Sequence, residues 1–201
     1  MSEISTERGR RPGNPRTRES ILEAAMAAFA RHGYTKTTIR GVAREAGVDP
    51  ALVMHFFGTK DGLFDAAVRE GGIPVTLLRE VIDEGVDGLG ERLAMRYLRL
   101  WEDPELGPRM HAVVSAATSS PAAAGLLKEF MRGQLIRPIA DRLEGDDAEE
   151  RVLMMATQLV GIGLMRYVLR VEPLSSMPLA AVVAHAAPNL QRYLTGTAAS
   201  R

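Results

Sequence analysis

Apolar residues recur at helical spacing soon after the start of the chain. Ile21, Leu22, Ala25 and Phe29 fall on one face of an amphipathic helix that begins near residue 17. Gly33 stands where a helix commonly ends, because glycine accepts the left-handed conformation of a C-terminal cap. The pattern therefore predicts a first helix over about residues 17–33.

Two short helices with clear boundary signals follow. Thr38 is a favourable N-cap for a helix that ends at Gly47. Asp49 is a favourable N-cap for the next helix, which has Pro50 at its first position and ends near Gly58. The two helices are joined by a tight turn, in which Gly47 tolerates a positive φ.

The remainder of the chain also follows a helical period, and no run alternates with the period of a strand. A fourth helix opens at Thr59 and Asp61, and the further predicted segments are 74–84, 88–102, 107–118, 121–144, 147–170 and 178–195. We therefore predict an all-α fold with three parts. They are a disordered basic arm (1–14), an N-terminal three-helix unit (15–60) and a larger helical body (61–201).

Formal charge divides unevenly along the chain, although the net charge is zero. Residues 1–60 carry ten Lys/Arg and six Asp/Glu, whereas residues 61–201 carry fifteen and nineteen. The stretch from Arg8 to Arg18 holds five arginines and no acid. Such an arm indicates a polyanionic partner, but a solvated tail explains it equally well.

Several classes of protein are disfavoured by composition. The chain has no cysteine, which excludes disulfide scaffolds, cysteine–zinc sites and cysteine nucleophiles. No apolar run approaches the ~18 residues of a membrane span, and the N-terminus lacks the apolar core of a secretory signal. We expect a cytoplasmic, nucleoid-associated protein with no membrane partner.

Residues 38–57 have the spacing of a helix-turn-helix. Ala43 is the small residue that a steep helix crossing needs, Gly47 follows four residues later, and the apolar Val53 lies six beyond. Val42 and Val48 stand at positions where apolar side chains can pack between the two predicted helices. The stretch predicts a DNA-binding unit.

This region resembles the tetracycline-repressor (TetR) family of transcriptional regulators. The resemblance rests on ILEAAMAAFARHGY, TTIRGVA and REAGVDPALVMHFFGTKDGLF, and it spans about residues 15–70. It implies that the helix from Asp49 to Phe57 enters the major groove of double-stranded DNA. The DNA contacts that it implies are Thr38, Arg40, Asp49, Pro50, Ala51, Met54, His55 and Lys60.

Two positions depart from the family pattern. Met54 stands where many relatives have tyrosine, and Phe56 stands where they have histidine. Neither side chain can make the polar contact of the residue it replaces, although His55 lies one position away. Met54 and Ala51 favour apolar contacts with thymine methyl groups, which we state as a hypothesis.

The helical body carries the features of a small-molecule site. Methionine fills irregular gaps and also forms adaptable binding surfaces, so core packing and effector binding both explain the methionines here. The candidate effector pocket, for a molecule of unknown identity, comprises Tyr97, Trp101, Met110, Phe130, Met131 and Met165.

Two segments, 147–170 and 178–195, are apolar on more than one face and form the candidate homodimer interface. Packing within one chain is the alternative. The resemblance implies a homodimeric repressor on a palindromic operator, from which an effector releases it.

Other functions have less support in the sequence. We find no catalytic constellation, no metal-ligand spacing and no nucleotide-binding motif, so we expect no enzyme activity and no cofactor. A DNA-binding architectural protein without an effector is the main alternative, and a helical enzyme is a weaker one.

Overall fold

The computed structural model describes residues 15–72 and 80–196. The predicted basic arm (1–14) lies outside the described residues, as does most of the predicted segment 74–84. Every regular element within these residues is helical and none is a strand, which confirms the all-α prediction.

The N-terminal part consists of four helices and a short π-helix. They are α1 (Pro15–Lys36), α2 (Ile39–Glu45), α3 (Pro50–Phe57), α4 (Lys60–Ala67) and η1 (Val68–Gly72). The first helix ends close to its predicted limit, because Gly33 breaks the helical geometry with φ 74° and ψ 165° and only a short turn follows. The positive φ at Gly33 is one that residues with a side chain rarely adopt.

The body contains the remaining described elements. They are α6 (Leu89–Glu102), α7 (Leu106–Ser119), α8 (Pro121–Met131), η2 (Arg132–Ile136), α9 (Arg137–Ala140), α10 (Ala148–Gly163), η3 (Leu164–Val168) and α11 (Leu179–Thr195). The predicted helix 121–144 is thus three consecutive helical pieces that end at Ala140. The predicted helix 147–170 likewise passes from α10 into a π-helical turn before it ends.

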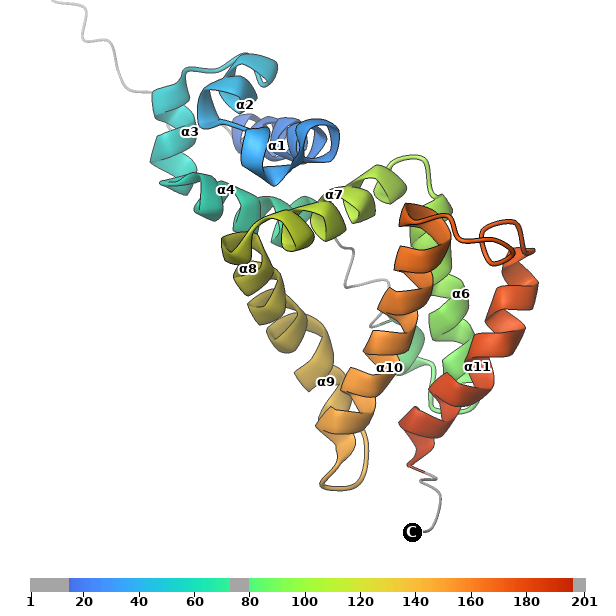
Figure 1. Cartoon of the computed structure of the whole chain (residues 1–201). Helices are drawn as coiled ribbons and strands as arrows, with labels where there is room; N and C mark the ends of the chain where they lie inside the picture. The colour runs from blue at the N-terminus through green and yellow to red at the C-terminus, as the bar shows by residue number, and fades with distance from the viewer. Residues whose placement is uncertain (1–14, 73–79, 197–201) are drawn as a thin grey trace, which may run out of the picture.

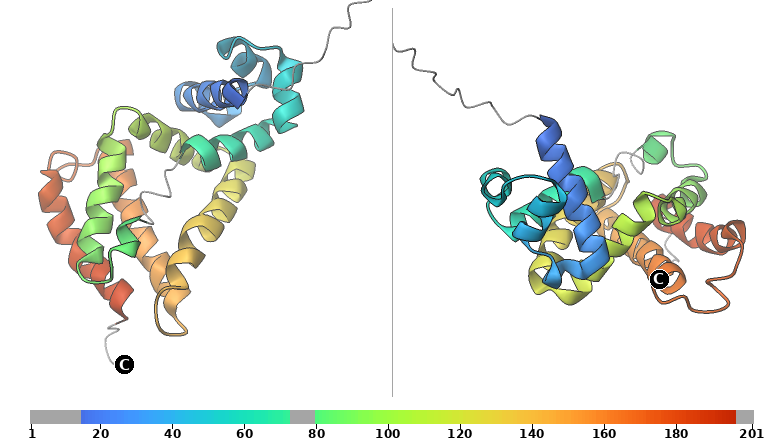
Figure 2. Two further views of the ribbon diagram at one scale, coloured as in Figure 1. Left: turned by 180° about the vertical axis from the view of Figure 1, so that it is seen from behind. Right: turned by 90° about the horizontal axis from the view of Figure 1, so that it is seen from above.

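The N-terminal unit sits at one end of an elongated molecule (Figure 1). Helix α7 runs beneath it, and α8–α9 and α10 complete the other two sides of a triangle (Figure 1). Helices α6 and α11 pack against each other beside α10, and the view from behind shows the same arrangement (Figure 2).

Two apolar clusters hold the described part of the chain together. The N-terminal cluster includes the fully buried Ile21 and Phe29 of α1 and Phe64 of α4, and it continues into Val113 of α7 and Phe130 of α8. The body cluster is built mainly from α6, α10 and α11. Helix α7 therefore belongs to both clusters, because its Met110 packs in the second one.

Candidate functional site

Side-chain caps fix the two helices of the predicted helix-turn-helix. The Thr38 hydroxyl accepts a hydrogen bond from the Gly41 N–H at 3.1 Å, which caps α2. The Asp49 carboxylate accepts one from the Ala51 N–H at 2.7 Å, which caps α3. Gly47 adopts φ 67° in the turn between them. The structure thus has the caps and the turn glycine that the sequence predicts.

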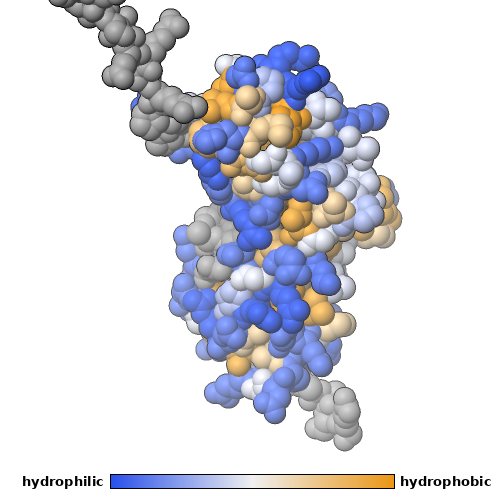
Figure 3. Space-filling view, turned by 90° about the vertical axis from the view of Figure 1, so that its left-hand side faces the viewer, coloured by the Kyte–Doolittle hydropathy of each residue, from blue (hydrophilic) through white to orange (hydrophobic). Residues whose placement is uncertain are grey.

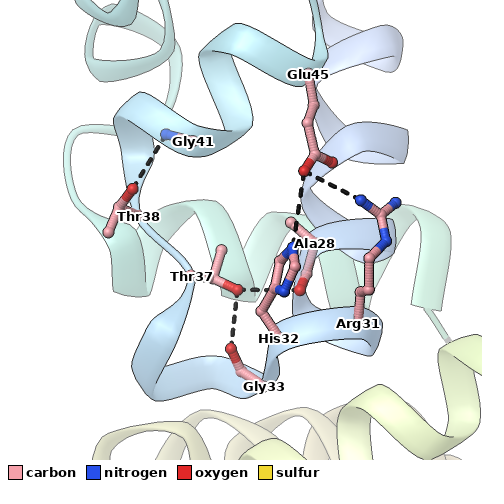
Figure 4. A network of polar contacts seen from close by, with 8 residues as sticks. All are labelled: Ala28, Arg31, His32, Gly33, Thr37, Thr38, Gly41 and Glu45. Atoms are coloured by element: carbon pink, nitrogen blue, oxygen red, sulfur yellow. Dashed lines mark hydrogen bonds and ion pairs between the residues drawn. The ribbon is translucent and has the colours of Figure 1, made fainter.

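The inner side of the helix-turn-helix, where α2 and α3 meet, is buried. Val42, Ala43 and Val53 have no exposed surface. Figure 4 shows how polar contacts then hold α2 against α1: the Thr37 hydroxyl donates to a backbone carbonyl of α1, and Glu45 pairs with Arg31 at 3.3 Å. These contacts fix the position from which α3 projects.

The outer face of α3 is exposed and mostly apolar. Pro50, Ala51, Met54 and His55 all face solvent, and the Met54 side chain is 53% exposed. Figure 3 looks at the side of the molecule on which α3 lies, and apolar atoms gather there in the upper part among polar ones. A protruding helix with an apolar tip can offer methyl and thioether groups to a groove, but few hydrogen bonds.

The two basic residues of the predicted set differ in their surroundings. Arg40 is exposed on α2. Lys60 is half-buried: its Nζ donates to the Thr35 carbonyl oxygen at 3.2 Å and lies 4.4 Å from the centre of the Tyr34 ring. Burial lowers the pKa of Lys60, and the nearby Asp61 opposes that change. Lys60 is therefore held in one position at the start of α4.

Below the N-terminal unit, the body encloses an apolar cavity of about 360 Å³. Its wall comes from α6, α7, α8, η2, α9 and α10, the elements that form and flank the triangle of Figure 1. Of the eighteen described residues that line it, sixteen are aliphatic or methionine, and the other two are Tyr97 and Lys128. A cavity of this size and polarity suits a small organic molecule.

Three of the six residues predicted for an effector pocket line this cavity, namely Tyr97, Met110 and Met131. Burial raises the pKa of Tyr97 to about 12, so its hydroxyl is neutral at physiological pH. It is one of the few polar groups in the wall.

The other three predicted pocket residues lie outside the lining. Trp101 packs behind Tyr97, with their ring centres 6.4 Å apart, and stacks on Tyr167. Phe130 belongs to the N-terminal cluster, and Met165 is 39% exposed on η3. The remaining lining residues are mostly leucine, valine, isoleucine and alanine, which carry no sequence signal that distinguishes a cavity wall from ordinary core.

Helix α10 carries an unusual number of exposed apolar side chains. Leu153 and Met154 are each 51% exposed, and Val160 is 42% exposed. With Met165 and Val168 they form a stripe along the solvent side of α10 and η3, which we call the α10 stripe. Val160 also lines the cavity.

Residues 15–72 and 80–196 hold neither a metal-ligand cluster nor a membrane-spanning helix. No cluster of His, Asp and Glu side chains has a metal-binding arrangement in that part of the chain. None of its helices has the length and apolar character that a membrane crossing requires.

Comparison with known proteins places both halves of the chain in one group. A model of "Bacterial regulatory proteins, tetR family" matches residues 21–67, and a model of "Tetracyclin repressor-like, C-terminal domain" matches residues 87–194. A solved TetR-family regulator from Streptomyces coelicolor is 37% identical, with a TM-score of 0.68, over 92% of this chain and 98% of that one.

Curated relatives match over shorter lengths. The transcriptional regulator BetI 2 of Chromohalobacter salexigens is 39% identical over 65% of this chain, and the repressor AcnR of Corynebacterium glutamicum is 37% identical over 51%. The matched segments span 58% and 48% of those two proteins.

Proposed function

The chain belongs to the TetR family of bacterial regulatory proteins, and we propose that it is a homodimeric repressor that binds a palindromic operator and releases it when a small molecule enters the cavity. The proposal has three parts, which concern DNA, the dimer and the effector.

One observation carries the DNA part: α3 projects from a capped and buried junction with α2, and its outer face is exposed. Thr38 and Asp49 cap the two helices, and Val53 is buried beneath α3. We infer that Pro50, Ala51 and Met54 face the bases in the major groove, while Arg40 and Lys60 contact phosphates.

A titration against salt tests these phosphate contacts. An operator obtained by selection from genomic DNA is bound by the purified protein at several salt concentrations. We expect Arg40→Ala and Lys60→Ala each to weaken binding and to reduce the slope of log K against log [salt] by about 2 per dimer, because each removes one phosphate contact from each of the two subunits.

The matched control is Arg99→Ala, which removes an exposed arginine from α6, outside the helix-turn-helix. It should leave the slope unchanged. An unaltered slope in both the Arg40 and Lys60 variants would overturn the assignment. Failure to select any operator would overturn the proposed function itself.

The α10 stripe supports the dimer. Exposed contiguous apolar side chains on a soluble protein indicate an interaction surface. The adjacent solvent face of α11 presents small residues, Ala180 and Ala184, which permit close helix packing. We infer that segments 147–170 and 178–195 pair with the same segments of a second copy. The two copies of α3 would then lie roughly 34 Å apart, one turn of DNA.

Analytical ultracentrifugation tests this interface. The double variant Leu153→Glu/Met154→Glu introduces two charges into the α10 stripe and should give a folded monomer. Val86→Glu is the control, because Val86 is also exposed, at 44%, but lies outside the stripe. A double variant that remains a dimer would contradict the interface.

Shared residues support the link between cavity and DNA. Val113 of α7 and Met131 of α8 line the cavity and also pack with the N-terminal cluster. A molecule in the cavity would therefore press on side chains that support α1 and α4. It shifts the equilibrium only if it binds one arrangement of these helices better than the other.

A further inference from the structure

We propose that the effector is an amphiphile with one anionic head group and an aliphatic body, and that Lys128 binds the head group. This inference rests on the proposed function and narrows it to a chemical class. It follows from the composition of the cavity wall and from the position of Lys128, the one charged residue among the described residues that line the cavity.

The wall of the cavity selects an aliphatic body. Aliphatic and methionine side chains surround the space, and Tyr97 is the only aromatic residue among the lining residues that the structure describes. A planar aromatic effector would find one ring to stack on. A flexible hydrocarbon fits better, because Met110, Met131 and Met155 adapt their shape to it.

The mouth of the cavity lies between α8 and α10. Two lining residues are exposed in the single chain, namely Lys128 on α8 and Val160 on α10. Val160 also belongs to the α10 stripe, whereas Lys128 lies outside the segments of the proposed dimer interface. Ala124 precedes Lys128 by one helical turn and also lines the cavity, so Lys128 stands on the cavity side of α8. Its aliphatic stem can lie along the wall while its ammonium group stays at the water boundary.

The charge of Lys128 is not balanced at this place. Among residues 15–72 and 80–196, no acidic residue lines the cavity and no carboxylate forms an ion pair with Lys128. The neighbouring Arg132, by contrast, pairs with Glu149 at 3.5 Å. A ligand with an anionic head group would supply the missing partner while its apolar body fills the cavity.

Isothermal titration calorimetry of the full chain tests the proposal with three ten-carbon probes, used below their micelle concentrations. They are decanoate, decan-1-ol and decylamine, which share the body and differ in the charge of the head group. We expect decanoate to bind at least tenfold more tightly than the alcohol and the amine. Decanoate should also weaken operator binding.

Lys128→Met keeps an unbranched apolar chain similar to the stem of lysine but removes the charged ammonium group. In this variant decanoate should lose its advantage, whereas the affinity for decan-1-ol should stay within about twofold. Arg132→Met is the matched control, because Arg132 lies four residues further along the same helical stretch and does not line the cavity. It should retain the preference for decanoate.

Equal or tighter binding of decan-1-ol, or a preference for decanoate that survives in Lys128→Met, would overturn the proposal. So would the absence of binding by all three probes. Operator binding without any probe is measured separately. The proposed function stands if the operator is bound, even where the preference for an anionic head group fails.

Discussion

The Arg109 guanidinium donates a hydrogen bond to the carbonyl oxygen of Gly71, across 2.7 Å. Arg109 lies on α7, which forms part of the cavity wall, and Gly71 lies in η1, which follows α4 at the end of the N-terminal part. Side-chain contacts between α7 and this end of the DNA-binding unit are thus partly polar. We expect this directional bond to carry a shift of α7 to η1, should a ligand in the cavity move α7.

Arg109→Met should weaken the coupling between effector and DNA. The variant keeps an apolar stem on α7 but loses the donor, and we expect the effector to change operator affinity about fivefold less than in the natural chain, which corresponds to about 1 kcal/mol of coupling. Operator affinity is measured with and without saturating effector. Arg99→Met serves as the control, and an unchanged ratio in Arg109→Met would show that the bond plays no part in coupling.

Replacement of single thymines in the operator by uracil should locate the contact of Met54. Uracil differs from thymine only by the missing methyl group, and one methyl group removed from water contributes about 0.8 kcal/mol, so affinity should fall about fourfold at the contacted position. Met54→Ala should bind more weakly and lose this sensitivity. Uracil outside the half-sites is the control, and no sensitive position anywhere would refute apolar recognition by α3.

Gly90→Ala should destabilise the body by about 1–3 kcal/mol, as expected for overpacking. A Cβ atom at this position would lie 2.5 Å from the Gln191 backbone nitrogen and 2.6 Å from the Ala187 carbonyl oxygen, so α6 and α11 would have to separate. Gly125→Ala is the matched control, because nothing lies within 4 Å of its Cβ and the helix should gain up to about 1 kcal/mol. Urea denaturation compares the two, and equal stabilities would disprove the close approach.

The neutral form of His111 should contribute to stability. Burial of the imidazole lowers the pKa of His111 below its ordinary value of 6.5, and the positive charge of the nearby Arg170 lowers it further. The unfolded chain then binds a proton more readily than the folded one, so stability is full above pH 6.5 and declines as the pH falls below it. Melting temperatures between pH 7.5 and 5.5 should fall less for His111→Gln than for the natural chain; identical pH profiles would contradict this.

Local chemistry made the helix-turn-helix predictable. Thr38, Asp49 and Pro50 act within one or two turns of their own position, so their roles follow from short sequence windows. The cavity was less predictable, because periodicity indicates that a side chain is buried but not against which partner. Phe130 is buried as expected, yet it packs with α1 and α4 rather than toward the cavity. Lys128 gave no signal in the sequence, because its role depends on the position of α10.

The N-terminal cluster includes Ala116 and Phe130, which lie well beyond the predicted boundary at residue 60. A graft that exchanged only the first sixty residues for those of a relative would therefore meet an α7–α8 surface shaped for different side chains. A working chimaera has to carry the facing residues of α7 and α8 with it. Since those helices also line the cavity, the surface that supports the N-terminal unit and the wall of the cavity are not separable modules in this chain, and each constrains how the other can evolve.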